Sequence, residues 1–138
     1  MAPQDPADLG QGPTIESRME RRFIVMSTRA PLLQSLEPLT PAGWTQVTVT
    51  DLDDIGPWNE LLLHRFMVLD LDDPEAFDPL DVIQTLRMQY QINLPVFCVG
   101  GDADLQGDMR LARADRFFTE AELQEMLPRF FELYGWGG

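Results

Sequence analysis

Three aspartates follow a short apolar run near the middle of the chain, and their side chains are suited to binding a cation. Residues 66–69 are all apolar, and Asp70, Asp72 and Asp73 come directly after them. Carboxylate oxygens at the end of a buried strand are ligands that hard divalent ions prefer. The alternative, which we favour, is that Asp70 only accepts hydrogen bonds from the neighbouring loop.

A second acidic segment, residues 102–108, resembles the first half of a calcium-binding EF-hand loop. Its aspartates stand at alternate positions, and Gly107 occupies the sixth. The twelfth position must supply a bidentate carboxylate, but here it is Arg113. We therefore expect an acidic loop whose aspartates cap a helix.

The chain has one histidine, His64, and one cysteine, Cys98. A catalytic triad, a histidine-based metal cluster and an intrachain disulfide are therefore unsupported. Cys98 lies in an apolar run and is expected to be buried, whereas His64 is expected at the surface or at an edge. We predict no enzymatic activity, no metal and no cofactor.

The charge balance narrows the classes of partner. The chain has 23 acidic and 10 basic residues, a net charge of −13, and every basic residue is an arginine. Without lysine, Schiff-base chemistry and a lysine-containing phosphate loop are excluded. The acidity argues against nucleic acid and anionic membranes, so a charged partner is expected to be a basic protein surface. Because no signal peptide or long apolar run is present, a cytoplasmic location is expected.

The elements that must position these residues alternate along the chain. Residues 1–20 are rich in proline, glycine and acidic groups and predict a flexible tail, and 21–138 predict one folded domain. Strands are predicted near 23–26, 44–50, 66–69, 95–99 and 116–118. Helices are predicted near 30–36, at 79–89, at 105–112 and after Thr119, which forms a capping box with Glu122. A short helix or an irregular segment is predicted between residues 54 and 63. Pro128 is expected to kink or interrupt the last helix.

This alternation predicts an α/β fold with a single doubly wound sheet of five parallel strands. We expect the strand order 2-1-3-4-5, in which ligands bind beyond the carboxyl ends of the strands. The acidic segments 51–54, 70–75 and 102–108 all fall at that edge of the sheet. Unless a metal or a basic partner neutralises the edge, it should repel a phosphoryl group.

The order of elements and the residues around Asp70 resemble the receiver domain of two-component response regulators, which has a flavodoxin-like (CheY-like) fold. Residues 68–74 resemble the end of the family's third strand, where the phosphoacceptor aspartate is followed four residues later by a proline, here Pro74. Residues 94–97 resemble the fourth strand, and 114–118 the fifth. The resemblance covers about 22–134.

The resemblance also shows which of the family's active groups are replaced. Ser27 and Thr28 stand where an acidic pair should hold Mg²⁺, and hydroxyls are poor ligands for that ion. Gly100 replaces the hydroxyl residue after the fourth strand, and Glu120 replaces the lysine that neutralises the phosphoryl group. Of the constellation only Asp70 remains. The resemblance therefore implies a degenerate pseudo-receiver that works through phosphorylation-independent protein contacts.

The C-terminal segment carries four large aromatic side chains, Phe130, Phe131, Tyr134 and Trp136. One interpretation is that they pack the last helix onto the sheet. The other is that they form an interface for a protein partner or for a second copy in a homodimer. The resemblance implies the second, since receiver-like domains commonly dock through the last two helices and the strand between them.

Three functional hypotheses follow. The leading one is a non-catalytic pseudo-receiver module in signalling or regulation. The first alternative is a single-domain response regulator that is phosphorylated on Asp70. The second is an assembly module similar to the wing domain of bacterial basic-amino-acid decarboxylases, which residues 94–97 and 127–131 resemble.

Overall fold

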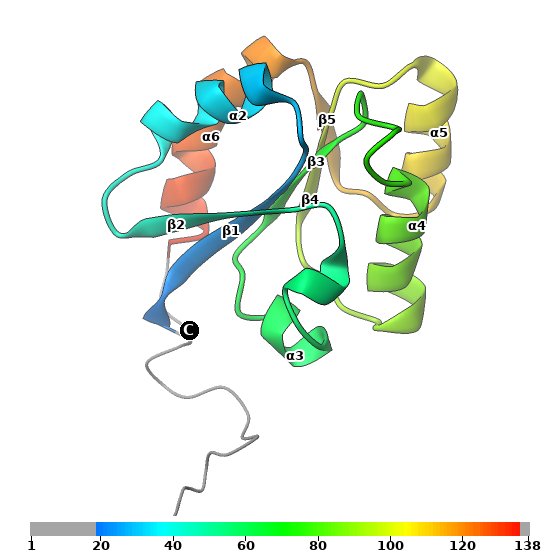
Figure 1. Cartoon of the computed structure of the whole chain (residues 1–138), viewed down its shortest axis with the longest axis horizontal. Coiled ribbons are helices and arrows are strands. Elements are labelled where there is room, and N and C mark those ends of the chain that lie inside the picture. The colour runs from blue at the N-terminus through cyan, green and yellow to red at the C-terminus, as the bar shows by residue number, and fades with distance from the viewer. Residues whose placement is uncertain (1–18, 136–138) are drawn as a thin grey trace, which may run out of the picture.

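The computed structural model describes residues 19–135 (Figure 1). Residues 1–18, which make up most of the predicted tail, and residues 136–138 lie outside the described residues. Within residues 19–135, no helix is long and apolar enough to cross a membrane.

Five parallel strands form one sheet in the order β2-β1-β3-β4-β5, as predicted. The strands are β1 (Arg21–Met26), β2 (Trp44–Val49), β3 (Met67–Asp70), β4 (Val96–Val99) and β5 (Arg116–Phe118). Every residue of β3 and β4 is buried. This burial explains why both strands read as continuous apolar runs in the sequence.

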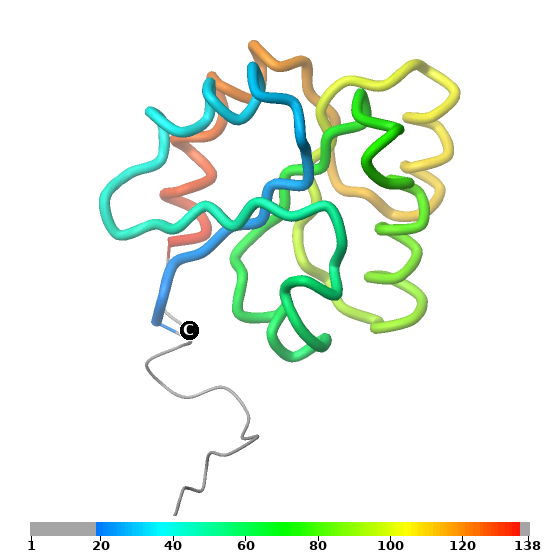
Figure 2. The backbone as a smooth tube through the Cα atoms, in the orientation of Figure 1, coloured from blue at the N-terminus to red at the C-terminus, as the bar shows by residue number. Residues whose placement is uncertain are grey.

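Helices cover both faces of the sheet. They are α2 (Ala30–Leu36), α3 (Trp58–Leu61), α4 (Pro79–Gln84), α5 (Ala103–Leu111) and α6 (Glu120–Leu133). The backbone trace shows α2 and α6 together on one side, and α4 and α5 on the other (Figure 2). The apolar core is divided in the same way, since Phe23 and Val25 of β1 pack with α2 and α6, and Ile24 and Met26 pack with the other helices.

The last helix, α6, runs without a break from Glu120 to Leu133 and contains Pro128. The predicted interruption at Pro128 is therefore wrong. A proline inside a helix removes one backbone hydrogen bond and costs about 3 kcal/mol. The buried side chains Leu123, Leu127 and Phe130 anchor α6 on the sheet on either side of the proline. Their packing offsets that cost.

The second half of the predicted helix 79–89 is a π-helical turn, Thr85–Gln89. Arg87 lies inside this turn and is buried, with 6% of its surface exposed. Its guanidinium donates to the carbonyl of Ile92 at 2.9 Å and to Asp115 Oδ2 at 2.8 Å. This pair ties the turn to the loop before β5.

The burial of the single cysteine was predicted correctly, and that of the single histidine was not. Cys98 is fully buried, as predicted, and burial raises the pKa of its thiol to about 12. His64 is also buried, with 5% of its surface exposed, so its predicted place at the surface is wrong. Its Nδ1 lies 3.0 Å from the carbonyl of Glu60, which can only accept, so the proton sits on Nδ1. This contact satisfies one polar atom of the ring with a backbone carbonyl of α3.

Candidate functional site at the carboxyl edge of the sheet

Asp70 is the last residue of β3 and has no exposed surface. Each of its carboxylate oxygens accepts two hydrogen bonds. Oδ2 accepts from Ser27 Oγ at 2.7 Å and from Arg29 Nε at 2.7 Å. Oδ1 accepts from Arg29 Nη2 at 3.1 Å and from the backbone N–H of Asp72 at 3.0 Å. The last contact confirms the interpretation in which Asp70 accepts hydrogen bonds from its own loop.

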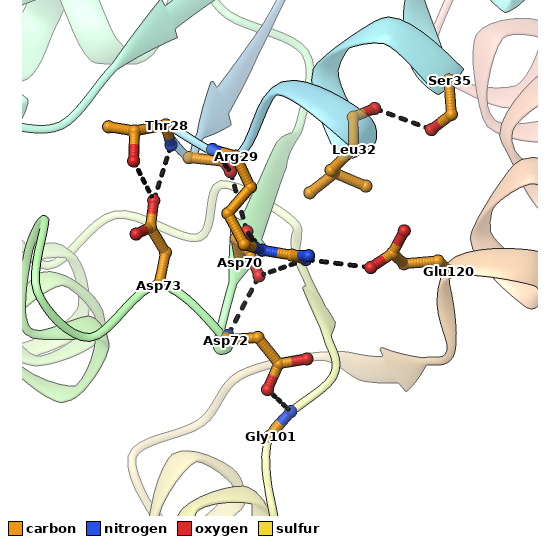
Figure 3. Close-up of polar contacts among 10 residues, drawn as sticks. Thr28, Arg29, Leu32, Ser35, Asp70, Asp72, Asp73, Gly101 and Glu120 are labelled. Atoms are coloured by element: carbon orange, nitrogen blue, oxygen red, sulfur yellow. Dashed lines mark hydrogen bonds and ion pairs between the residues drawn. The ribbon is translucent and has the colours of Figure 1, made fainter.

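Arg29 joins two carboxylates at this edge (Figure 3). The residue precedes α2, so its side chain extends from the loop after β1. Its guanidinium binds Asp70 bidentately and also contacts Glu120 Oε2 at 3.0 Å. The hydrogen bond to Asp70 is the largest influence and raises the pKa of Arg29, although burial opposes it. The cation is therefore permanent, and it offsets part of the negative charge at this edge from within the chain.

Ser27 and Thr28 act as hydrogen-bond donors and hold the loop after β1 in place. Ser27 Oγ donates to Asp70 and accepts from the backbone N–H of Arg29 at 3.0 Å, which fixes the start of α2. The backbone N–H and the Oγ1 of Thr28 both donate to Asp73 Oδ2, at 2.6 and 2.8 Å. Both hydroxyls are thus engaged by carboxylates, Ser27 by Asp70 and Thr28 by Asp73.

The fold family implies Mg²⁺ at this edge, but the residues present do not fit it. The ion needs several oxygen ligands in octahedral geometry. Here the guanidinium of Arg29 covers both oxygens of Asp70, and a second cation at that place would meet like charge. Among residues 19–135 no group of three or more His, Cys, Asp or Glu side chains could hold a metal ion.

Gly100 has a structural reason to lack a side chain. Its φ is +78°, and a Cβ placed there would overlap Asp72 Oδ2. The Asp72 side chain lies over this glycine and accepts from the backbone N–H of Gly101 at 2.9 Å (Figure 3). The position that holds a hydroxyl in the family is therefore filled by an aspartate carboxylate from the loop after β3.

Glu120 is the first residue of α6, where the helix dipole favours a negative charge. Its side chain is 38% exposed and turns to Arg29. The predicted capping box is present, because Thr119 Oγ1 accepts from the N–H of Glu122 and Glu122 Oε1 accepts from the N–H of Thr119. The cap fixes the direction of the first turn, and so brings Glu120 to the site.

Sequence reasoning missed Arg29. Its signal was present, because an arginine directly follows the two replaced positions Ser27 and Thr28. Reading each family position separately showed the lost acidic pair and the lost lysine. It did not show that Arg29, next to the replaced acidic pair, contacts Glu120 at the position of the lost lysine.

The other predicted acidic site also has a structural role. Asp102 caps α5, since its Oδ1 accepts from the N–H of Leu105 at 2.8 Å. Asp104 and Asp108 lie within α5 itself. The predicted helix cap is therefore confirmed for Asp102, whereas most of the segment predicted as an acidic loop is part of the helix.

The predicted aromatic interface is wrong for the two phenylalanines. Phe130 and Phe131 are 2% and 5% exposed, because they close the core between α6 and the sheet. The ring of Phe130 stacks on Phe97 with the centroids 4.2 Å apart, and Phe131 packs edge-on against Phe23 at 5.1 Å. Tyr134 is partly buried against the same cluster, and Trp136 lies outside the described residues.

No protein-family model matches this sequence, and no curated protein matches it. Solved structures do match. The receiver domain of a response regulator from Rhodospirillum rubrum aligns with a TM-score of 0.62 and 13% identity, over 81% of this chain and 94% of that one. A signal receiver domain from Bermanella marisrubri aligns with a TM-score of 0.57 and 21% identity, over 80% and 97%.

A third structure is that of a phosphorylated cyanobacterial phytochrome response regulator, RcpA. It aligns with a TM-score of 0.59 and 16% identity, over 83% of this chain and 93% of that one. In all three comparisons the match covers nearly the whole of the solved domain and most of this chain. Together with the strand order, these matches show that the chain has the fold of response-regulator receiver domains.

Proposed function

We propose that the chain is a pseudo-receiver module whose phosphoacceptor position is closed by its own arginine, and that it acts in signalling through phosphorylation-independent protein–protein contacts. The observation that carries this proposal is the bidentate pair between Arg29 and Asp70. A nucleophilic carboxylate must present an oxygen to the incoming phosphorus. Asp70 is fully buried, and both of its oxygens are engaged.

Electrostatics supports the same proposal. A phosphoryl group on Asp70 would carry a charge of roughly −1.5 to −2. It would have to displace Arg29 from Asp70 and would then face the carboxylate of Glu120, which now contacts the same guanidinium. In the family that this chain resembles, a lysine and a metal ion neutralise the charge of the phosphoryl group. This chain offers one arginine that is already shared between two acids.

For partners, the net charge of −13 favours a basic protein surface over nucleic acid or an anionic membrane. A cytoplasmic, non-catalytic role without a cofactor accords with this proposal. The similarity to a decarboxylase wing domain stays a prediction, and its assembly role would be compatible with the same closed site.

The proposal is tested by incubating the full chain with acetyl phosphate and Mg²⁺ and measuring its intact mass. We expect no phosphoryl adduct. An adduct of one group per chain that disappears in Asp70→Asn would overturn the proposal. It would favour the alternative, a single-domain response regulator phosphorylated on Asp70.

A further inference from the structure

The two edges of the sheet differ in how they are protected. β5 is three residues long and begins with a charged residue, Arg116. The guanidinium of Arg110 lies 4.7 Å from the ring centre of Phe117, and that of Arg116 lies 5.1 Å from the ring centre of Phe118. A short edge strand that carries charges resists pairing with another chain.

β2, at the opposite edge, is neither short nor charged. It is six residues long and, within residues 19–135, pairs only with β1, in an unbroken register from Arg21↔Trp44 to Met26↔Val49. The strand contains no proline and no charged residue. Every second backbone N–H and C=O of such a strand points away from the sheet and is available to a further strand.

The neutral segment is longer than the strand. Residues 38–50 contain no charged side chain, although the chain has 23 acidic and 10 basic residues. Acidic groups stand at both ends of the segment, Glu37 before it and Asp51, Asp53 and Asp54 after it. β2 is therefore a neutral edge in a strongly acidic protein.

An open groove runs along this edge, with a volume of about 490 Å³. Its lining comes from Glu37, Thr40, Pro41, Ala42, Trp44, Thr45, Gln46 and Thr48. Thr45 and Gln46 are adjacent, so their side chains lie on opposite faces of the sheet. A groove that both residues line follows the edge of β2 itself. Thr45 and Thr48 are exposed, and the buried Gln46 Oε1 has no hydrogen-bond partner among the described residues.

We propose that β2 pairs antiparallel with β2 of a second copy of this chain, so that one continuous sheet crosses the dimer. Two copies that each carry a charge of −13 repel one another, and the neutral edge is where they can approach at the lowest electrostatic cost. A basic protein would instead be attracted to the acidic loops. A second copy therefore fits β2 better than a basic partner does.

The charge pattern also selects the antiparallel arrangement. In an antiparallel pair centred on Gln46 or Val47, Asp51 of one copy lies opposite Pro41 or Gly43 of the other, which are neutral. In a parallel pair in register, the acidic groups at residues 51–54 of the two copies would lie side by side, which is destabilising. A two-fold axis perpendicular to the sheet produces the antiparallel pair.

Sedimentation velocity on the full chain, up to several hundred micromolar, tests this dimer. We expect a reversible dimer, and we expect Thr45→Lys with Thr48→Lys to weaken it by about tenfold or more, because lysines on an edge strand resist its pairing with another chain. The matched control is Gln84→Lys with Gln89→Lys, two exposed positions on another part of the surface. Both double variants lower the net negative charge equally, so general repulsion cannot account for a difference between them.

Circular dichroism checks the fold of each variant, and the single variant Thr48→Lys replaces the double variant if the latter is unfolded. A chain that stays monomeric at every concentration would overturn the proposal and leave this edge to a strand from another protein. A dimer that both double variants leave intact would also overturn it. The dimer rests on the proposed function, since it names a partner for the same module. The two proposals are nevertheless tested separately, because a phosphoryl adduct refutes the closed site and a monomer refutes the β2 pair.

Discussion

The guanidinium of Arg29 donates to both oxygens of the Asp70 carboxylate, from Nε to Oδ2 at 2.7 Å and from Nη2 to Oδ1 at 3.1 Å. The two residues come from the loop after β1 and the end of β3, which are neighbouring strands. A fixed side-chain cation thus sits where the family, by the resemblance, places a metal ion and a lysine. Through both of its oxygens, Asp70 thus joins the end of β3 to the loop after β1.

The first prediction concerns the free energy of unfolding. Arg29→Ala leaves the Asp70 carboxylate buried without its cation, and breaking a buried pair in this way is strongly destabilising. Because the Arg29 side chain is 28% exposed, water moderates the loss, and we expect about 2 to 4 kcal/mol in urea unfolding. Arg29→Lys should lie between the wild type and Arg29→Ala, since an ammonium cannot bind bidentately. An Arg29→Ala variant as stable as the wild type would contradict the structural role of the pair.

The second prediction is a change of sign at Glu120. In the wild type, Glu120→Lys places a second cation beside Arg29 and should cost about 1 kcal/mol. In the Arg29→Ala background the same change supplies a cation near Asp70 and should stabilise the protein. A double-mutant cycle by urea unfolding measures this coupling. Equal effects of Glu120→Lys in both backgrounds would show that the two positions are independent.

The third prediction compares two glycines. Gly100→Ala forces a Cβ into the Asp72 carboxylate at a φ of +78°, so Asp72 must release its hydrogen bond to Gly101. We expect a loss of about 2 to 3 kcal/mol. Gly107→Ala is the matched control, because its Cβ would meet nothing within 4 Å inside α5, and it should stabilise by about 0.5 to 1 kcal/mol. Thermal unfolding of the two variants tests this prediction. A Gly100→Ala variant as stable as the wild type would refute the close approach of Asp72.

The fourth prediction concerns pH. Burial lowers the pKa of His64 below its ordinary value of 6.5, so the unfolded chain binds the proton more readily than the folded chain does. The stabilising contribution is full above pH 6.5 and is lost as the pH falls through the folded-state pKa. Urea unfolding between neutral pH and about pH 5.5 should therefore show decreasing stability. His64→Asn should flatten this dependence, whereas an equal slope in both proteins would assign it to other groups.

Much of the fold could be predicted because its physical causes are local. The fully apolar runs of β3 and β4 indicate strands that are buried on both faces. Their alternation with helices, under the right-handed crossover rule, leaves few possible strand orders. The capping box of Thr119 and Glu122 likewise depends on residues three positions apart.

The features that could not be predicted depend on where side chains from distant segments meet. Arg29 and Glu120 are 91 residues apart in the chain, and only the folded sheet brings them together. The aromatic residues of α6 posed the same difficulty. Five phenylalanine and tryptophan side chains, from β1, β2, β4, β5 and the loop before β3, had to be placed before the space for Phe130 and Phe131 was known. Composition shows an excess of aromatic groups, but it does not show the volume that receives them.

The most direct test of the closed site is the NMR signal of the Arg29 Nε–H, followed during addition of Mg²⁺ and acetyl phosphate. Because this group donates to the buried Asp70, the account predicts a signal that exchanges slowly with solvent and stays unchanged by either addition. Loss of the signal in Asp70→Asn would confirm its assignment to the pair. A wild-type signal that exchanges rapidly, or that Mg²⁺ displaces in a saturable way, would contradict the account.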